Sequence, residues 1–133
     1  LNMAVKTIII IQGMHNAIKN VAEKNMTTVL AVTRRVIIEY IMDEHTREEC
    51  NKKIDPYTPP FWYIDNSEDV NEIKKLGNDF FKPSRFGLKL DDKISKELDK
   101  YAKEINMKAN NLIVCLLDIM LSKSNNINFN LRI

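Results

Sequence analysis

The sequence predicts a mainly helical fold with a short two-stranded antiparallel β-ribbon, built from two copies of a strand–helix–helix unit. Three observations lead to this fold class. Residues 85–90 alternate between apolar and polar, two apolar stripes of helical period follow them, and the same pattern stands once more in the first part of the chain. A chain of 133 residues suits one compact domain, or two small units that share a core.

The strand of the second unit is predicted from its period of two. Its apolar positions are Phe86, Leu88 and Leu90. The positions between them are Arg85, Gly87 and Lys89. Such alternation is typical of a strand with one buried face, so we expect the first set to face the core and the second to face outward.

Two helices are predicted after this strand. Asp91 or Asp92 offers an N-cap. The first helix has the apolar stripe Ile94, Leu98, Tyr101, Ala102 and Ile105. Asn106 allows a turn, and a second helix starts near residues 108–110. Its wide stripe is Leu112, Ile113, Leu116, Leu117, Met120 and Leu121, and the helix ends within residues 122–126. One strand and two helices cannot close a core alone, so the unit must pair with another copy.

The first part of the chain supplies that copy. One constant offset, applied without gaps, aligns Ile8 with Leu88 and Ile18 with Leu98. The apolar period agrees through the strand and both helices. We therefore expect a first unit at 4–45, a linker with a short helix at 46–81, a second unit at 82–124 and a tail, a candidate strand, at 125–133.

The residues from Arg85 to about Ser122 resemble the ribbon-helix-helix family, the β-ribbon DNA readers that include the Arc and methionine repressors. The strand, the helix stripe and the segment Met107–Ile113 carry the resemblance. The tandem form resembles transcription regulators of archaeal filamentous viruses. The resemblance implies two ribbon-helix-helix motifs that form an intrachain pseudo-dimer, with an antiparallel ribbon above four helices.

This resemblance implies sequence-specific binding of double-stranded DNA, with the ribbon in the major groove. The expected base-contacting residues are Arg85, Gly87, Lys89, Val5, Thr7 and Ile9. The expected phosphate-contacting residues, at the N-termini of the second helices, are Thr27, Thr28, Lys108 and Asn110. Lys6 falls on the inner face, and the run of four isoleucines leaves the register open to a one-residue slip.

Other classes of function find less support in the sequence. Three glycines, two histidines and no nucleophile motif argue against an enzyme, and we expect no cofactor or metal. The cluster His45–Cys50 is a weak metal motif and is better explained as a charged helix end. We expect Cys115 to be a buried hydrophobe and Cys50 an exposed free thiol. With no signal peptide or membrane span evident, the expected location is the cytoplasm, of a host cell if the chain is viral.

The linker and tail leave alternatives open. Residues 61–64 either pack on the core or contact a second chain or another protein. Ser67 is expected to cap a short helix that ends at Gly77. Residues 126–133 alternate again and either add a strand to a sheet edge, which would allow a homodimer, or form a disordered tail. The competing function is a protein-binding adaptor or antitoxin-like module on the same scaffold.

Overall fold

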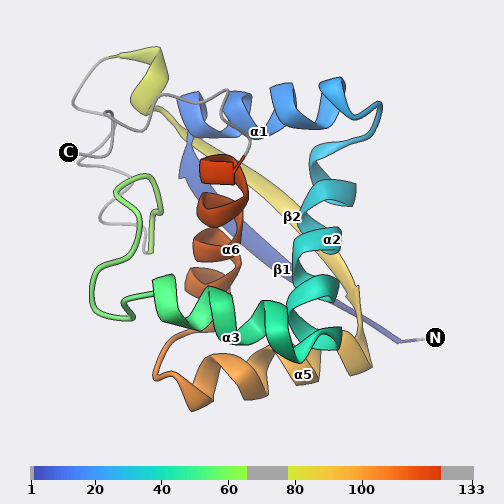
Figure 1. Cartoon of the computed structure of the whole chain (residues 1–133). Helices are drawn as coiled ribbons and strands as arrows, with labels where there is room; N and C mark the ends of the chain where they lie inside the picture. The colour runs from blue at the N-terminus through green and yellow to red at the C-terminus, as the bar shows by residue number, and fades with distance from the viewer. Residues whose placement is uncertain (1, 66–77, 124–133) are drawn as a thin grey trace.

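The computed structural model describes residues 2–65 and 78–123. Strand β1 (Met3–Ile11) is followed by helices α1 (Gln12–Lys24), α2 (Val29–Met42) and α3 (Glu44–Lys53). A 3₁₀ turn η1 (Asp79–Phe81), strand β2 (Pro83–Asp91) and helices α5 (Asp92–Glu104) and α6 (Ala109–Lys123) complete the described chain (Figure 1). The predicted fold class, mainly helical with a two-stranded antiparallel sheet, is confirmed.

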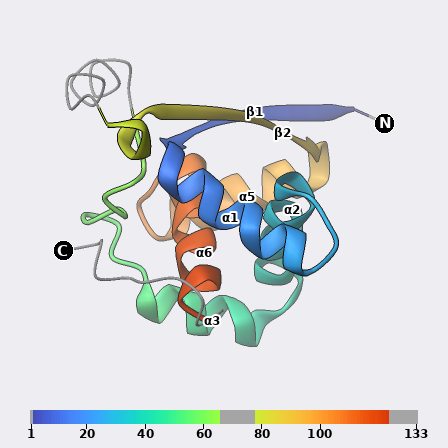
Figure 2. The same cartoon turned by 90° about the horizontal axis from the view of Figure 1, so that it is seen from above.

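The two strands form one ribbon on one face of the molecule, and the helices lie beneath it (Figure 2). Thr7 pairs with Gly87 at the middle of the ladder, Met3 with Asp91 at one end and Ile11 with Pro83 at the other. Ile8, Ile10, Leu88 and Leu90 are buried beneath the ribbon. Because these residues form the inner face, the predicted alternation holds and the isoleucine run shows no slip in register.

Corresponding elements of the two halves begin at the offset that the sequence pattern predicts. The strands begin at Met3 and Pro83, and both pairs of helices keep the same spacing. The turns before α2 and α6 also correspond, because Met26 and Asn106 both have positive φ, at 56° and 59°. Side chains cap the N-termini of two helices. The Asp91 side chain accepts a hydrogen bond from the N–H of Lys93 in α5, and Thr28 accepts one from the N–H of Ala31 in α2.

The segment after α3 closes one side of the core. Trp62 and Ile64 are buried, and the Trp62 indole N–H donates to the Asp118 carboxylate of α6, with a nitrogen–oxygen distance of 3.4 Å. The N–H of Ile11 donates to the carbonyl of Trp62, and the N–H of Ile64 donates to that of Ile9. This stretch therefore packs on the core and along the edge of β1, although Phe61 keeps 39% of its surface exposed.

Cys50 and the helix that carries it differ from the prediction. Cys50 is not an exposed thiol: it is 7% exposed, on the face of α3 turned toward α2 and α6. Burial raises the pKa of its thiol above the ordinary value. Helix α3 was not predicted, and it lies across the expected boundary at residues 45 and 46. Cys115 is buried, as expected. The predicted helix at 67–77 and the tail strand lie outside the described residues.

Within residues 2–65 and 78–123, none of the helices alone has both the length and the apolar character needed to cross a membrane. Among the helices of these two stretches, α5 and α6 taken together are the one pair that meets those criteria, across a break bent by 88°.

Candidate nucleic-acid interface

The outer face of the ribbon carries the six predicted base-contacting residues. Three cross-strand pairs share this face: Val5 with Lys89, Thr7 with Gly87, and Ile9 with Arg85. All of these residues are exposed except Ile9, which is partly buried and packs against the core. Figure 2 shows that no described helix covers this side of the ribbon. The structure thus brings the six residues together on one open surface.

The cations of the ribbon divide between its two faces. Lys6 points to the inner side, where its ammonium lies 2.9 Å from the carboxylate of Asp99 on α5 and its side chain is 15% exposed. Arg85 and Lys89 lie on the outer side and are exposed. Both outward cations therefore belong to β2, while β1 presents Val5, Thr7 and Ile9.

Gly87 leaves the centre of the outer face open. An added Cβ at this position would meet only the side chain of Val5, at 3.8 Å, which is ordinary van der Waals contact. The backbone fold therefore does not require glycine here. Its effect is on the surface, because a bound molecule can approach the backbone and the neighbouring Thr7 closely.

The predicted phosphate-contacting residues of the first half lie at the start of α2. Thr28 is the N-cap, and its hydroxyl accepts a hydrogen bond from the N–H of Ala31 at 3.1 Å. Thr27 is exposed, and its N–H donates to the carbonyl of Ala22. The first N–H groups of any helix have no intrahelical acceptor, so this end presents donors and a partial positive charge.

The two corresponding residues of the second half differ in how far they are engaged within the chain. The side-chain amide of Asn110 donates to the carbonyl of Thr7 at 3.0 Å and so ties α6 to the centre of β1. The Lys108 ammonium lies 3.7 Å from the carboxylate of Asp65, but its side chain is 79% exposed. Lys108 is thus available at the surface, whereas Asn110 has a structural role that its sequence context does not signal.

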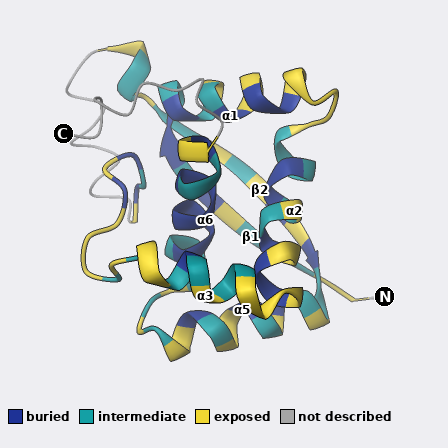
Figure 3. Ribbon diagram, viewed as in Figure 1, coloured by how far each residue is buried: buried dark blue, intermediate teal, exposed yellow. Residues whose placement is uncertain are grey.

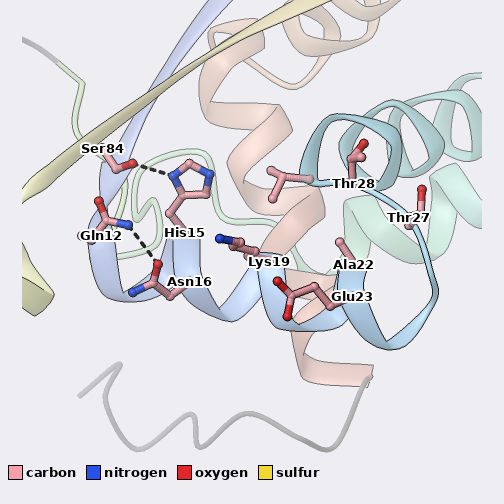
Figure 4. Close-up of a pocket in the computed structure, with 10 residues that line it drawn as sticks. Gln12, His15, Asn16, Lys19, Ala22, Glu23, Thr27, Thr28 and Ser84 are labelled. Carbon is pink, nitrogen blue, oxygen red and sulfur yellow. Dashed lines mark hydrogen bonds between the residues drawn. The ribbon is translucent and has the colours of Figure 1, made fainter.

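A pocket of about 500 Å³ lies between α1, the start of α2 and the start of β2 (Figure 4). Its lining includes Gln12, His15, Lys19, Thr28 and Ser84. His15 shares a hydrogen bond with the hydroxyl of Ser84, and its ring lies 5.3 Å from that of Phe86. In this pocket His15 and Lys19 of α1 lie near Thr28 of α2. Packing between separate elements brings them together, and no local sequence pattern predicts it.

The charge state of His15 follows from its surroundings. Burial first, and the positive charge of Lys19 second, lower the pKa of His15 below its ordinary value of 6.5. The imidazole is therefore neutral at pH 7. The charged side chains that line the pocket are Lys19, which is exposed, and Glu23.

Across the described stretches 2–65 and 78–123, no three His, Cys, Asp or Glu side chains are grouped so that they could hold a metal ion. His45 is exposed on α3, far from His15 in the sequence, and the hydroxyl of Thr46 donates to the carboxylate of Asp43. What the structure offers is an open strand face with two cations, beside a helix N-terminus.

Comparison with known proteins gives no family assignment: no family model, no curated protein and no solved structure matches this chain.

Proposed function

We propose that this chain is a sequence-specific regulator that binds double-stranded DNA, with two ribbon-helix-helix motifs folded into an intrachain pseudo-dimer. The outer face of the β1–β2 ribbon enters the major groove and contacts base edges. The groove is about 12 Å wide and admits a two-stranded ribbon. The observation that carries the proposal is the open outer face, with Arg85 and Lys89 exposed on it.

The pseudo-dimer is supported by the register of the ribbon. Thr7 and Gly87, which pair at its centre, are themselves equivalent positions of the two halves, because they are related by the same offset as Met3 and Pro83. We infer an approximate twofold axis through this pair that would relate β1 to β2, α1 to α5 and α2 to α6. Two halves related in this way present one strand each to the groove, as two subunits of a dimer would.

Contacts to the DNA backbone come from the flanks of the ribbon. The N-terminus of α2, capped by Thr28, favours a phosphate, and Lys19 in the adjoining pocket adds a positive charge. Lys108 has the corresponding place before α6. These contacts position the ribbon without reading sequence, and they make the affinity dependent on salt.

The experiment that tests this function is selection of a site from random duplexes, followed by fluorescence anisotropy with that site. The double variant Arg85→Ala/Lys89→Ala is expected to lose about tenfold or more of its preference for the site, because each cation–guanine contact contributes about 1–3 kcal/mol of discrimination. The matched control is Lys52→Ala/Lys53→Ala, which removes the same charge from α3, away from the ribbon (Figure 2).

Both variants must keep the wild-type circular dichroism spectrum for the comparison to hold. Equal loss of preference in both variants would show that net charge alone matters. The absence of any preferred duplex would overturn the proposal.

A second candidate function is a protein-binding adaptor or antitoxin-like module. Exposed apolar side chains away from the ribbon favour it: Ile38 and Met42 on α2, at 43% and 74% exposure, and Tyr57 after α3, at 82%. A stoichiometric protein partner, bound without any DNA preference and lost in Ile38→Asp/Met42→Asp, would support the adaptor.

A further inference from the structure

We infer that the DNA site has two chemically different strands, a purine-rich one facing β2 and a thymine-bearing one facing β1, and that the chain binds it in a single orientation. This inference rests on the proposed function. It depends on the way the register distributes the outward side chains between the two strands of the ribbon.

The pairing places one cation and one branched aliphatic side chain at each end of the outer face. Lys89 lies opposite Val5, and Arg85 lies opposite Ile9. The approximate twofold axis through Thr7 and Gly87 makes Arg85 and Val5 equivalent positions, yet one is a cation and the other is aliphatic. The two halves of the face are therefore chemically unlike at both outer positions.

The two cations of the outer face, Arg85 and Lys89, both lie on β2. Their position determines which DNA strand each strand of the ribbon contacts. Strands of a ribbon are about 4.8 Å apart, and the major groove is about 12 Å wide. Each strand therefore lies nearer to one DNA strand. Guanine O6 and N7, which accept from Arg and Lys, lie on the guanine's own side of the groove. The guanines contacted by Arg85 and Lys89 belong to the DNA strand beside β2.

The aliphatic side chains select a different feature on the other DNA strand. Val5 and Ile9 have no polar group to offer, and the apolar feature of the groove is the thymine methyl. A thymine beside β1 has its adenine partner on the strand beside β2, next to the guanines. Val5, with 60% of its surface exposed, makes the larger contact, because Ile9 is partly buried.

The length of the site follows from the strand. Val5 and Ile9 are four residues apart, which is about 14 Å at a rise of about 3.4 Å per residue. Base pairs rise by about 3.4 Å along the duplex. The two outer pairs thus span at most about four base-pair steps, with Thr7 and Gly87 over the centre.

The experiment uses the selected duplex with altered bases. Replacing thymine by uracil removes the methyl group, and replacing guanine by 7-deazaguanine removes N7. Uracil on the strand beside β1 should weaken wild-type binding by about threefold or more, but should have little effect on Val5→Ala/Ile9→Ala. The deazaguanine duplex should weaken the wild type while leaving Arg85→Ala/Lys89→Ala nearly unchanged. Met42→Ala, at an exposed position at the end of α2 and outside the ribbon, is the control.

The orientation of the protein on its DNA site is measured in a separate cleavage experiment. An iron–EDTA cleavage reagent is attached to Asn2→Cys, at the exposed start of β1, while Cys50 and Cys115 are buried. Cleavage confined to one end of the site supports the inference. Equal cleavage at both ends, or a selected palindrome that is indifferent to the thymine methyl, would overturn it and leave the proposed function intact. Failure to select any duplex would overturn both.

Discussion

Helices α2 and α6 have corresponding places in the two halves, yet their surroundings differ. Every residue of α6 from Leu112 to Asp118 is buried, whereas α2 exposes Arg35, Ile38 and Met42 between its buried positions (Figure 3). The segment around Trp62 covers the outer side of α6 near Asp118. In α2, Ile38 has the place that Asp118 has in α6, and it is at the surface. The connection between the halves thus buries α6, whereas the equivalent side of α2 remains at the surface.

The largest expected effect comes from removing this cover. Trp62→Ala should lower the free energy of unfolding by about 3–5 kcal/mol, because a fully buried aromatic side chain leaves a cavity against α6. Tyr57→Ala, in the same segment but exposed, should change it by less than about 0.5 kcal/mol. Urea unfolding followed by circular dichroism measures both, since Trp62 is the sole tryptophan of the sequence and its fluorescence is lost in the variant. Similar values for both would mean that the segment does not support α6.

A smaller effect is expected where η1 packs on α1. An added Cβ at Gly13 would overlap the ring of Phe80, whereas the corresponding Lys93 of α5 is exposed. Gly13→Ala should therefore lower the free energy of unfolding by about 1–3 kcal/mol through overpacking. Gly87→Ala, which meets only Val5 at 3.8 Å, should be neutral or slightly stabilising. Thermal unfolding of the two variants distinguishes them, and an unperturbed Gly13→Ala would indicate that Phe80 moves aside freely.

The smallest effect concerns pH and the pocket beside α1. Because the pKa of folded His15 is lowered from 6.5, the unfolded chain takes up the proton first as the pH falls. The free energy of unfolding should therefore decrease as the pH falls through about 6.5 and level off below the folded-state pKa. His15→Asn should flatten this dependence below about pH 6.5. An unchanged slope in His15→Asn would contradict the assignment.

Much of the ribbon and its flanking helices was predictable because local rules govern them. Alternation predicted the inner and outer faces of β2, and the constant offset between the two halves carried that assignment to β1. Asp91 and Thr28 cap helices as their residue types suggest. The i,i+4 spacing of Arg35 and Glu39 on α2 likewise suggests an ion pair, and the two side chains lie 3.1 Å apart.

Local rules failed where distant packing decides. Helix α3 has no apolar stripe, so its charged sequence indicated a linker, and Cys50 was expected to be exposed among charges. The burial of Cys50 depends on contacts with α2 and α6, and α6 is distant in the sequence. Likewise, nothing near Asn110 signals its bond to Thr7, and nothing near His15 signals Ser84.

The separation of β1 and β2 along the chain has a consequence for biosynthesis. The ribbon joins residues 3–11 to residues 83–91, so the first strand leaves the ribosome with no partner available. At about 5–20 residues per second, roughly 4–16 s pass before the second strand follows. During that interval the apolar run Ile8–Ile11 lacks its partner strand β2, although residues 62–64, which contact the edge of β1, are synthesised earlier. Because both strands belong to one polypeptide, the pairing of β1 with β2 is a unimolecular step. The rate of this pairing and the midpoint of unfolding are therefore independent of protein concentration, whereas those of a ribbon formed by two chains depend on it.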